Sequence, residues 1–159
     1  MPAKALTTIR KARVVLVDDL PIVRKGLAFL FGKEPDLEVC GEAESETEGL
    51  ERILGLKPDL AVVALGLKKG SGMGLIKRLR SHCPEVKILV FSMFDQPHFV
   101  ARALAAGAHG YVTKAQGTEE VLEAVRLVMG GKCYLSREMA ALTKRLGPSP
   151  SFWRAGRHV

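Results

Sequence analysis

Short runs of apolar residues alternate along this chain with longer segments whose apolar residues recur at helical spacing. Three runs are continuously apolar: Val14–Val17, Leu60–Leu65 and Ile88–Phe91. Continuous runs of this length are typical of parallel strands that are buried on both faces. The segment from Leu37 to Ala43 alternates apolar and polar residues, which favours a strand nearer the edge of the sheet. A fifth short strand is predicted at His109–Val112.

The segments between these runs carry apolar residues three or four positions apart, which places them on one face of a helix. These stripes comprise Val23, Leu27, Leu30 and Phe31; Leu50, Ile53 and Leu54; Leu75, Ile76 and Leu79; Phe99, Val100, Ala103 and Leu104; and Val121, Leu122, Val125, Val128 and Met129. Ser45 and Glu48 have the spacing of a helix capping box. Strand and helix therefore alternate five times, and right-handed crossovers predict a doubly wound α/β fold with a parallel sheet.

Folds of this kind bind ligands outside the carboxyl ends of their strands. Asp18 and Asp19 follow the first predicted strand, Ser92 follows the fourth and Lys114 follows the fifth. Adjacent carboxylates repel each other unless a cation lies nearby, and a hard ion such as Mg²⁺ would relieve that repulsion. A hydroxyl and an ammonium beside them would suit a phosphoryl group. Taken singly, the same residues fit a helix cap, a turn residue and a surface lysine.

Six stretches carry a family resemblance in their order and spacing. They are VVLVDDLPIVRKGL at 14–27, PDLAVVALGL at 58–67, GSGMGLIKRLR at 70–80, KILVFSMFD at 87–95, ALAAGAHGYVTKA at 103–115 and AVRLVMGGKCYLS at 124–136. From about Val14 to Gly131 the chain resembles the receiver domain of two-component response regulators, most closely the NarL/FixJ-type branch. The resemblance implies a flavodoxin-like fold with the strand order 2-1-3-4-5.

The resemblance also implies roles for single residues. Asp18 and Asp19 match the acid pair that holds Mg²⁺ in the family, and Gly66 takes the place whose backbone carbonyl would ligate the metal. Ser92 matches the hydroxyl that meets the phosphoryl group, and Lys114 matches the lysine that contacts it. These matches imply a phosphate site built next to a magnesium site.

Two further matches and three departures complete the comparison with the family. Tyr111 matches the aromatic residue whose rotamer follows the hydroxyl, and Gly72 matches the loop glycine after the third strand. Ala64 stands where the family has the aspartate that accepts the phosphoryl group, and a methyl group cannot attack phosphohistidine. Lys68 and Ala115 stand where many receivers have proline. Ala64 fits a natural pseudo-receiver and an engineered substitution alike, and it implies weakened Mg²⁺ binding.

We therefore expect a non-enzymatic signalling module whose conformation is set by packing and partners rather than by phosphoryl transfer. The expected partners are a sensor histidine kinase, another response regulator or a second copy in a homodimer. The alternative is the receiver part of a truncated NarL/FixJ-type DNA-binding transcription regulator. A small-molecule or enzymatic flavodoxin-like domain has little support, since no Gly-rich phosphate loop or nucleophile–base pair follows the strands.

Charge and composition limit the classes of protein and the cellular compartment that fit this chain. The net charge of +7 lies in the two ends of the chain, because residues 1–13 carry four basic residues and no acid, and residues 132–159 carry six basic residues and one acid. No helix-turn-helix pattern follows, so we expect no sequence-specific DNA binding. The apolar runs are far shorter than the roughly 20 residues that span a bilayer. Three widely spaced cysteines indicate reduced thiols in a cytoplasmic protein, and the four histidines are interpreted as surface or turn residues.

The predicted organisation has three parts. Residues 1–13 form a basic N-terminal tail, and residues 14–131 form the receiver-like domain. Residues 132–159 contain a linker helix, which Ser136 caps and which reaches about Leu146, followed by a mobile C-terminal tail.

Overall fold

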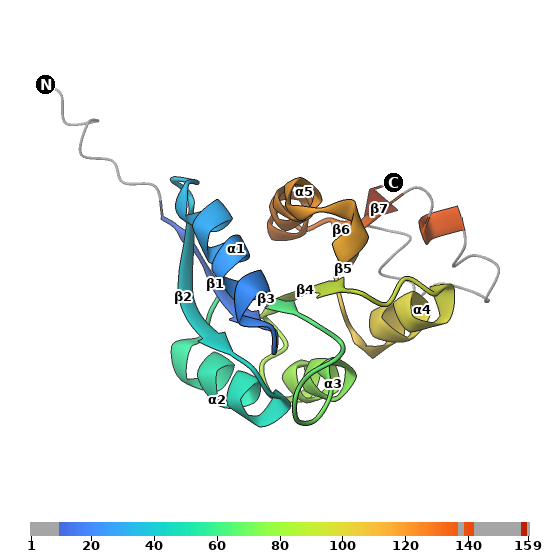
Figure 1. Cartoon of the computed structure of the whole chain (residues 1–159), viewed down its shortest axis with the longest axis horizontal. Helices are drawn as coiled ribbons and strands as arrows, with labels where there is room; N and C mark the ends of the chain where they lie inside the picture. The colour runs from blue at the N-terminus through green and yellow to red at the C-terminus, as the bar shows by residue number, and fades with distance from the viewer. Residues whose placement is uncertain (1–9, 137–138, 142–156, 159) are drawn as a thin grey trace, which may run out of the picture.

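A parallel sheet with helices on both faces forms the body of the computed structural model (Figure 1). The structure describes residues 10–136, 139–141 and 157–158. In chain order the strands are β1 (Ala12–Val17), β2 (Leu37–Ala43), β3 (Leu60–Val63), β4 (Lys87–Ser92), β5 (Gly110–Thr113), β6 (Cys133–Leu135) and β7 (Arg157–His158). The helices are α1 (Pro21–Gly32), α2 (Glu46–Leu56), α3 (Gly72–His82), α4 (Pro97–Ala106) and α5 (Thr118–Met129), with a 3₁₀ turn η2 at Lys114–Gln116.

The strand order is β2-β1-β3-β4-β5-β6-β7, and neighbouring strands pair in parallel. This order contains the predicted 2-1-3-4-5 arrangement and confirms the flavodoxin-like fold. The alternating segment forms β2 at one edge of the sheet, as its pattern indicated. The 3.6-residue stripes all fall within the five helices.

The sheet is longer at both ends than the predicted domain of residues 14–131. Ala12 and Arg13 belong to β1 and pair with β2, so the last two residues of the predicted N-terminal tail lie in the sheet. Beyond Gly131, β6 pairs with β5 in the segment predicted as linker, and its three side chains are buried. A strand of three residues is too short to show a period in the sequence, which is why it was missed.

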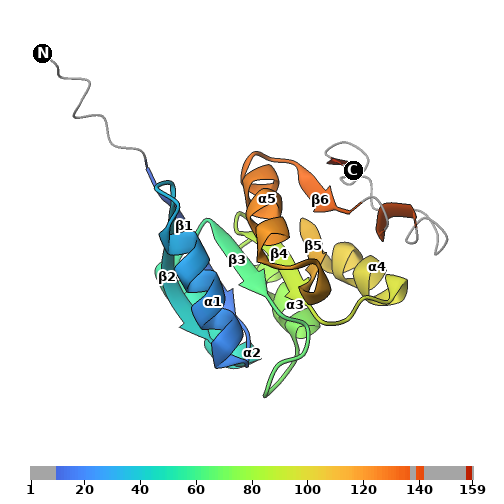
Figure 2. The same ribbon diagram turned by 45° about the horizontal axis from the view of Figure 1, so that its top comes forward.

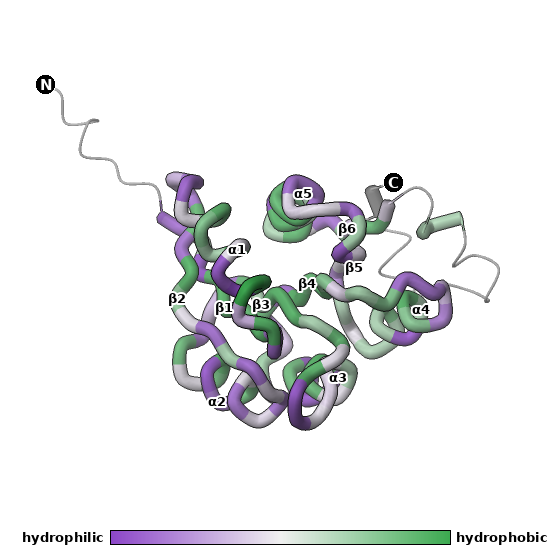
Figure 3. The backbone as a smooth tube through the Cα atoms, in the orientation of Figure 1, coloured by the Kyte–Doolittle hydropathy of each residue, from purple (hydrophilic) through white to green (hydrophobic). Residues whose placement is uncertain are grey.

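Two hydrophobic clusters lie on opposite faces of the sheet. Helices α1 and α5 cover one face, and α2, α3 and α4 cover the other (Figures 1 and 2). Val14 and Leu16 of β1 belong to the first cluster, whereas Val15 and Val17 belong to the second. Because successive strand residues point to opposite faces, a strand between two helix layers needs apolar residues at every position. Figure 3 shows hydrophobic colouring along these central strands.

Side-chain caps begin two of the helices. Ser45 Oγ accepts a hydrogen bond from the Glu48 amide at 3.1 Å, which confirms half of the predicted capping box. The Glu48 carboxylate accepts from the amide of Glu44 at 2.8 Å, one residue before the cap. Ser71 Oγ accepts from the Gly74 amide at 2.9 Å and caps α3 in the same way.

The predicted C-terminal helix begins where expected. Ser136 Oγ accepts from the Met139 amide at 3.2 Å, and residues 139–141 are helical. The remainder of the predicted helix, up to about Leu146, and most of the predicted tail lie outside the described residues. Within the described part of the chain, no helix is long and apolar enough to cross a membrane.

Candidate functional site

Asp18 and Lys114 form an ion pair at the carboxyl edge of the sheet. Lys114 Nζ lies 2.8 Å from Asp18 Oδ2, although β1 and β5 are separated in the sheet by β3 and β4. The lysine reaches across these strand ends, with its ammonium 6.0 Å from the ring centroid of Phe91 on β4. Both side chains are largely buried, at 5% exposed for Asp18 and 16% for Lys114. Asp18 Oδ1 accepts from the Leu20 amide at 2.9 Å, so each carboxylate oxygen has a donor.

The acid pair predicted as a metal site is only partly enclosed. Asp18 is buried, Asp19 is half-buried and Gly66 is exposed on the loop after β3. Among the described residues, no group of three or more histidine, cysteine, aspartate or glutamate side chains is arranged to hold a metal ion. Mg²⁺ is usually bound through one or two carboxylates and several waters. The two aspartates fit such a weak site, in which a cation and Lys114 would share the Asp18 carboxylate.

Ala64 follows β3 directly and is held there by backbone contacts. Its side chain is buried and its amide donates to the Val17 carbonyl at 2.9 Å. The amide of Gly72 donates to the Leu65 carbonyl at 2.8 Å, which brings the start of α3 against this strand end. A Cβ on Gly72 would stand 2.0 Å from the Ala64 carbonyl oxygen, so glycine is required for this approach.

Glu46 anchors the loop between β3 and α3, a role that sequence reasoning missed. Its carboxylate accepts from the Ser71 amide at 2.8 Å and lies 3.4 Å from the Arg78 guanidinium. The Glu46 amide donates to the Lys69 carbonyl at 3.0 Å. In the sequence Glu46 has only the signature of an acidic residue in the first turn of a helix, which gives no sign of a partner 25 residues away.

Ser92 and Tyr111 both form hydrogen bonds with the backbone of a third residue, Phe94. Ser92 is buried at the end of β4, and its hydroxyl accepts from the Phe94 amide at 3.2 Å. Tyr111 is fully buried on β5, and its hydroxyl donates to the Phe94 carbonyl. Burial raises the pKa of Tyr111 to about 12, against a smaller lowering by a hydrogen bond with Ser92, so the phenol stays protonated and can donate. Sequence reasoning missed Phe94, because it acts here through backbone atoms.

The structure therefore brings the predicted residues to one edge. Asp18, Ala64 and Lys114 directly follow β1, β3 and β5, and Ser92 is the last residue of β4. These four strands are consecutive in the sheet. Their polar groups are already engaged within the protein: the carboxylate with the ammonium, and the hydroxyl with a loop amide. The arrangement also places a buried methyl group, that of Ala64, at the end of β3.

His109, interpreted from the sequence as a surface or turn residue, lies in the bend just before β5 and is half-buried. Its Nδ1 accepts from the Ile88 amide at 3.0 Å. Burial, together with the nearby positive charges of Arg80 and Lys87, lowers the pKa of His109 to about 4. The imidazole is therefore neutral at physiological pH.

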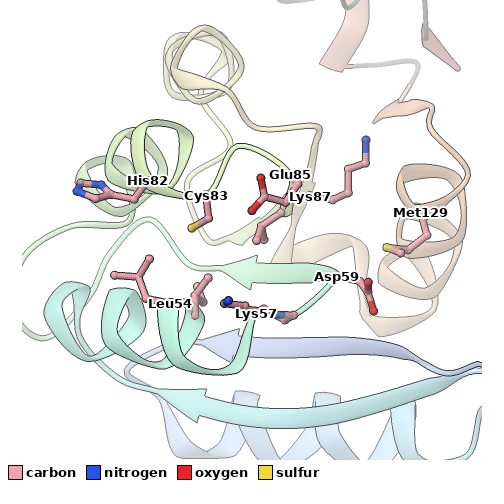
Figure 4. Close-up of a pocket in the computed structure, with 11 residues that line it drawn as sticks. Leu54, Lys57, Asp59, His82, Cys83, Glu85, Lys87 and Met129 are labelled. Atoms are coloured by element: carbon pink, nitrogen blue, oxygen red, sulfur yellow. The ribbon is translucent and has the colours of Figure 1, made fainter.

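A cavity of about 560 Å³ lies at the opposite end of the sheet, near the amino ends of β3 and β4 (Figure 4). Its lining includes both signs of charge, with Lys57 and Lys87 as well as Asp59 and Glu85. Cys83 also lines it, and burial raises the pKa of this thiol, which keeps it protonated. The cavity is thus remote from the ion pair of Asp18 and Lys114.

Comparison with known proteins agrees with this fold. The family described as the response regulator receiver domain matches residues 14–126. The chain therefore belongs to the receiver domain family of response regulators.

Individual relatives share this assignment. The chain is 38% identical over 135 residues to the DNA-binding transcriptional activator DevR/DosR of Mycobacterium tuberculosis, covering 84% of this chain and 62% of that protein. It is 36% identical over 129 residues to the response regulator GacA of Pseudomonas viridiflava, covering 80% and 60%. The chain thus spans about three fifths of the length of these curated relatives.

A solved structure shows the same fold. A two-component response regulator of the LuxR family from Aurantimonas sp. SI85-9A1 superposes with a TM-score of 0.81 at 32% identity, covering 86% of this chain and 99% of that chain. The receiver domain of the putative response regulator NarL from Mycobacterium tuberculosis superposes with a TM-score of 0.74 at 30% identity, covering 77% and 99%.

Proposed function

We propose that this chain is a receiver-like module of two-component signalling that takes no phosphoryl group at the usual position and acts through protein–protein contacts. The observation that carries the proposal is Ala64, a buried methyl group at the end of β3 beside the ion pair of Asp18 and Lys114. Resemblance to the family puts the phosphoacceptor aspartate at this position. The next three residues, Leu65, Gly66 and Leu67, supply no carboxylate in its place.

The rest of the site would still recognise parts of the missing group. Lys114 and Ser92 would contact a phosphoryl group, and Tyr111 would report the position of the Ser92 hydroxyl. Asp18, Asp19 and the Gly66 carbonyl would hold Mg²⁺, which supplies charge neutralisation when bound. With two carboxylates and with Lys114 already on Asp18, we expect this binding to be weak. The module is proposed to be non-enzymatic and cytoplasmic.

Exposed apolar side chains support a role in protein contacts. Among the described residues, Ile22 and Phe29 on α1 are 76% and 67% exposed, and Met93 in the loop after β4 is 72% exposed. Contiguous apolar patches often mark interaction surfaces, and Ile22 and Phe29 are seven residues apart, which places them on the same face of α1. The proposed partners are a sensor histidine kinase, another response regulator or a second copy of this chain.

A second candidate function follows from the relatives. DevR/DosR is named a DNA-binding transcriptional activator, and this chain spans about three fifths of its length. The chain would then be the receiver part of a NarL/FixJ-type transcription regulator. A reading frame with a helix-turn-helix pattern directly downstream in the gene would favour this candidate over a free-standing module.

Intact mass after incubation with Mg²⁺ and acetyl phosphate tests the main proposal. The matched pair is the unsubstituted chain and Ala64→Asp. We expect only the substituted chain to gain a phosphoryl group, because the acceptor is then restored next to Lys114, Ser92 and the acid pair. Labelling of the unsubstituted chain would reveal another acceptor and contradict the proposal. Labelling of neither chain would mean that the remaining site residues have also lost their roles.

A further inference from the structure

We infer that Phe94 is an internal latch, which joins the loops after β3 and β4 and holds Ser92 and Tyr111 in one arrangement without a phosphoryl group. The inference deepens the proposed function and rests on it for its signalling meaning. The latch itself is a property of the described contacts.

The backbone of Phe94 is held from two strands. Its amide donates to the Ser92 hydroxyl at 3.2 Å, and its carbonyl accepts from the Tyr111 hydroxyl. Ser92 is 2% exposed and Tyr111 is fully buried, so neither hydroxyl can exchange this partner for bulk water without moving. A shift of either side chain therefore breaks a bond to Phe94, and a shift of Phe94 leaves two buried hydroxyls without that partner.

The ring of Phe94 makes contacts on both sides of this loop. Two of its ring carbons lie 3.6 and 3.7 Å from the point where a Cβ on Gly66 would stand, in the loop after β3. The ring also stacks on Phe99 of α4, with centroids 4.8 Å apart and planes 24° apart. The His98 ring in turn lies against Phe99, and the centroids of these two rings are 4.3 Å apart. One side chain thus ties the loop after β3 to the first turn of α4.

The latch does not belong to the hydrophobic core. Phe94 is 39% exposed, and it is in neither of the two buried clusters of the sheet. Its loss should therefore loosen the two loops and leave the sheet folded. The Ser92 hydroxyl accepts from the Phe94 amide, so the loop after β4 is folded back onto the end of its own strand in the unmodified protein.

The consequence is a coupling of four elements through one residue. Phe94 connects the loop after β3, the loop after β4, the start of α4 and the buried tyrosine of β5. With the latch closed, the surface formed by α4 and β5 is held in a single arrangement. A partner that binds this surface would meet it in the arrangement that the latch holds. A partner that changes this arrangement would have to displace the Phe94 ring.

Amide hydrogen exchange on the full chain tests the latch, with Phe94→Ala compared with Phe29→Ala. Phe29 is the matched control, because it is a phenylalanine on α1 with 67% exposure and lies outside these loops. We expect Phe94→Ala to speed exchange at residues 65–70 and 92–99 by about tenfold, the effect of losing one aromatic pair and its neighbouring contacts. Exchange in β1 and β3 should stay as in the natural chain, and Phe29→Ala should leave both loops unchanged.

Tyr111→Phe provides a second variant that keeps the ring of Phe94. It removes the donor to the Phe94 carbonyl, so exchange should rise at residues 93–95 and less at residues 65–70. Unchanged exchange in both loops of Phe94→Ala would refute the latch, and so would an even rise across the sheet, which would indicate a general loss of stability. These outcomes are independent of the phosphoryl test, since exchange is measured on unmodified protein.

Discussion

At the scale of single residues, Gly72 shows how closely the candidate site is packed. A Cβ at this position would stand 2.0 Å from the Ala64 carbonyl oxygen and 2.7 Å from the Leu65 Cα. Both are backbone atoms, which cannot rotate out of the way. We expect Gly72→Ala to lower the free energy of unfolding by about 1–3 kcal/mol, measured by urea denaturation.

Gly26→Ala is the matched control for this substitution. Gly26 lies within α1, and no atom outside its own helix lies within 4 Å of the added Cβ. Alanine favours the helical backbone over glycine by about 0.5–1 kcal/mol, so this variant should be neutral or more stable. Equal losses in both variants would show that the approach of α3 to β3 is not the cause.

His109 predicts a pH dependence of stability. Its pKa is about 4 in the folded protein and 6.5 in the unfolded chain, so between these values only the unfolded state binds the proton. The stability that neutral His109 contributes is therefore present above pH 6.5 and is lost as pH falls toward 4. Because the ring is partly exposed, we expect a loss of about 1–2 kcal/mol rather than the full value of the shift.

Urea unfolding at pH 7 and pH 4.5 checks this expectation, with His109→Asn as the control. An asparagine oxygen can still accept from the Ile88 amide but does not titrate. Carboxylates titrate in both proteins, so the difference between them isolates the histidine. The same pH dependence in the two proteins would contradict the proposed burial of a neutral imidazole.

At the scale of elements, hydrogen bonds at helix ends decide where the loops around the site begin. Ser45 caps α2, and the first residue of that helix, Glu46, anchors the loop after β3. By contrast, the N-cap residues of α1 and α4, Leu20 and Gln96, make no side-chain cap bond. Both of these helices have proline at their start, which needs no hydrogen bond for its missing N–H.

Ser45→Ala should therefore cost about 1 kcal/mol of stability, because the Glu48 amide loses its acceptor. Thermal unfolding measured by circular dichroism gives the change. Ser45→Asp keeps a side-chain acceptor and places a negative charge at the helix N-terminus, so it should remain close to the natural chain. If Ser45→Asp is destabilised as much as Ser45→Ala, then the cap bond is not the source of the loss.

At the scale of the whole molecule, the sheet does not end with α5. Tyr134 of β6 packs into the cluster of α1 and α5, whereas Cys133 and Leu135 pack into the cluster on the other face. This short strand therefore contributes to both hydrophobic cores. It also provides backbone partners for β5, where Gly110 pairs with Tyr134 and Tyr111 pairs with Leu135.

A chain that ends at residue 131 should be less stable than one that ends at residue 141. The shorter chain lacks the three buried side chains of β6 and also the buried side chains of Met139 and Ala140. A large apolar side chain contributes about 1–3 kcal/mol when fully buried. We expect a difference of at least about 3 kcal/mol in urea unfolding. Equal stability of the two chains would show that the folded domain ends at Gly131, as the sequence pattern predicted.

The sequence by itself determined the layered architecture and the edge at which the site forms. Continuous apolar runs such as Val14–Val17 are stable only when both strand faces are buried, and polar residues such as Asp18 then follow the end of the apolar run. The order of strands and helices along the chain, together with the right-handedness of the crossovers, then limited the possible topologies of the sheet.

Only the tertiary structure decided which groups meet. The pairing of Lys114 with Asp18 spans two intervening strands, Phe94 connects Ser92 to Tyr111 through backbone atoms, and Glu46 holds a loop 25 residues away. Burial of His109 likewise depends on β4 lying beside it. Periodicity reports which face of an element is apolar, because that is a local property. It carries no information about contacts between side chains that folding brings together from distant parts of the chain.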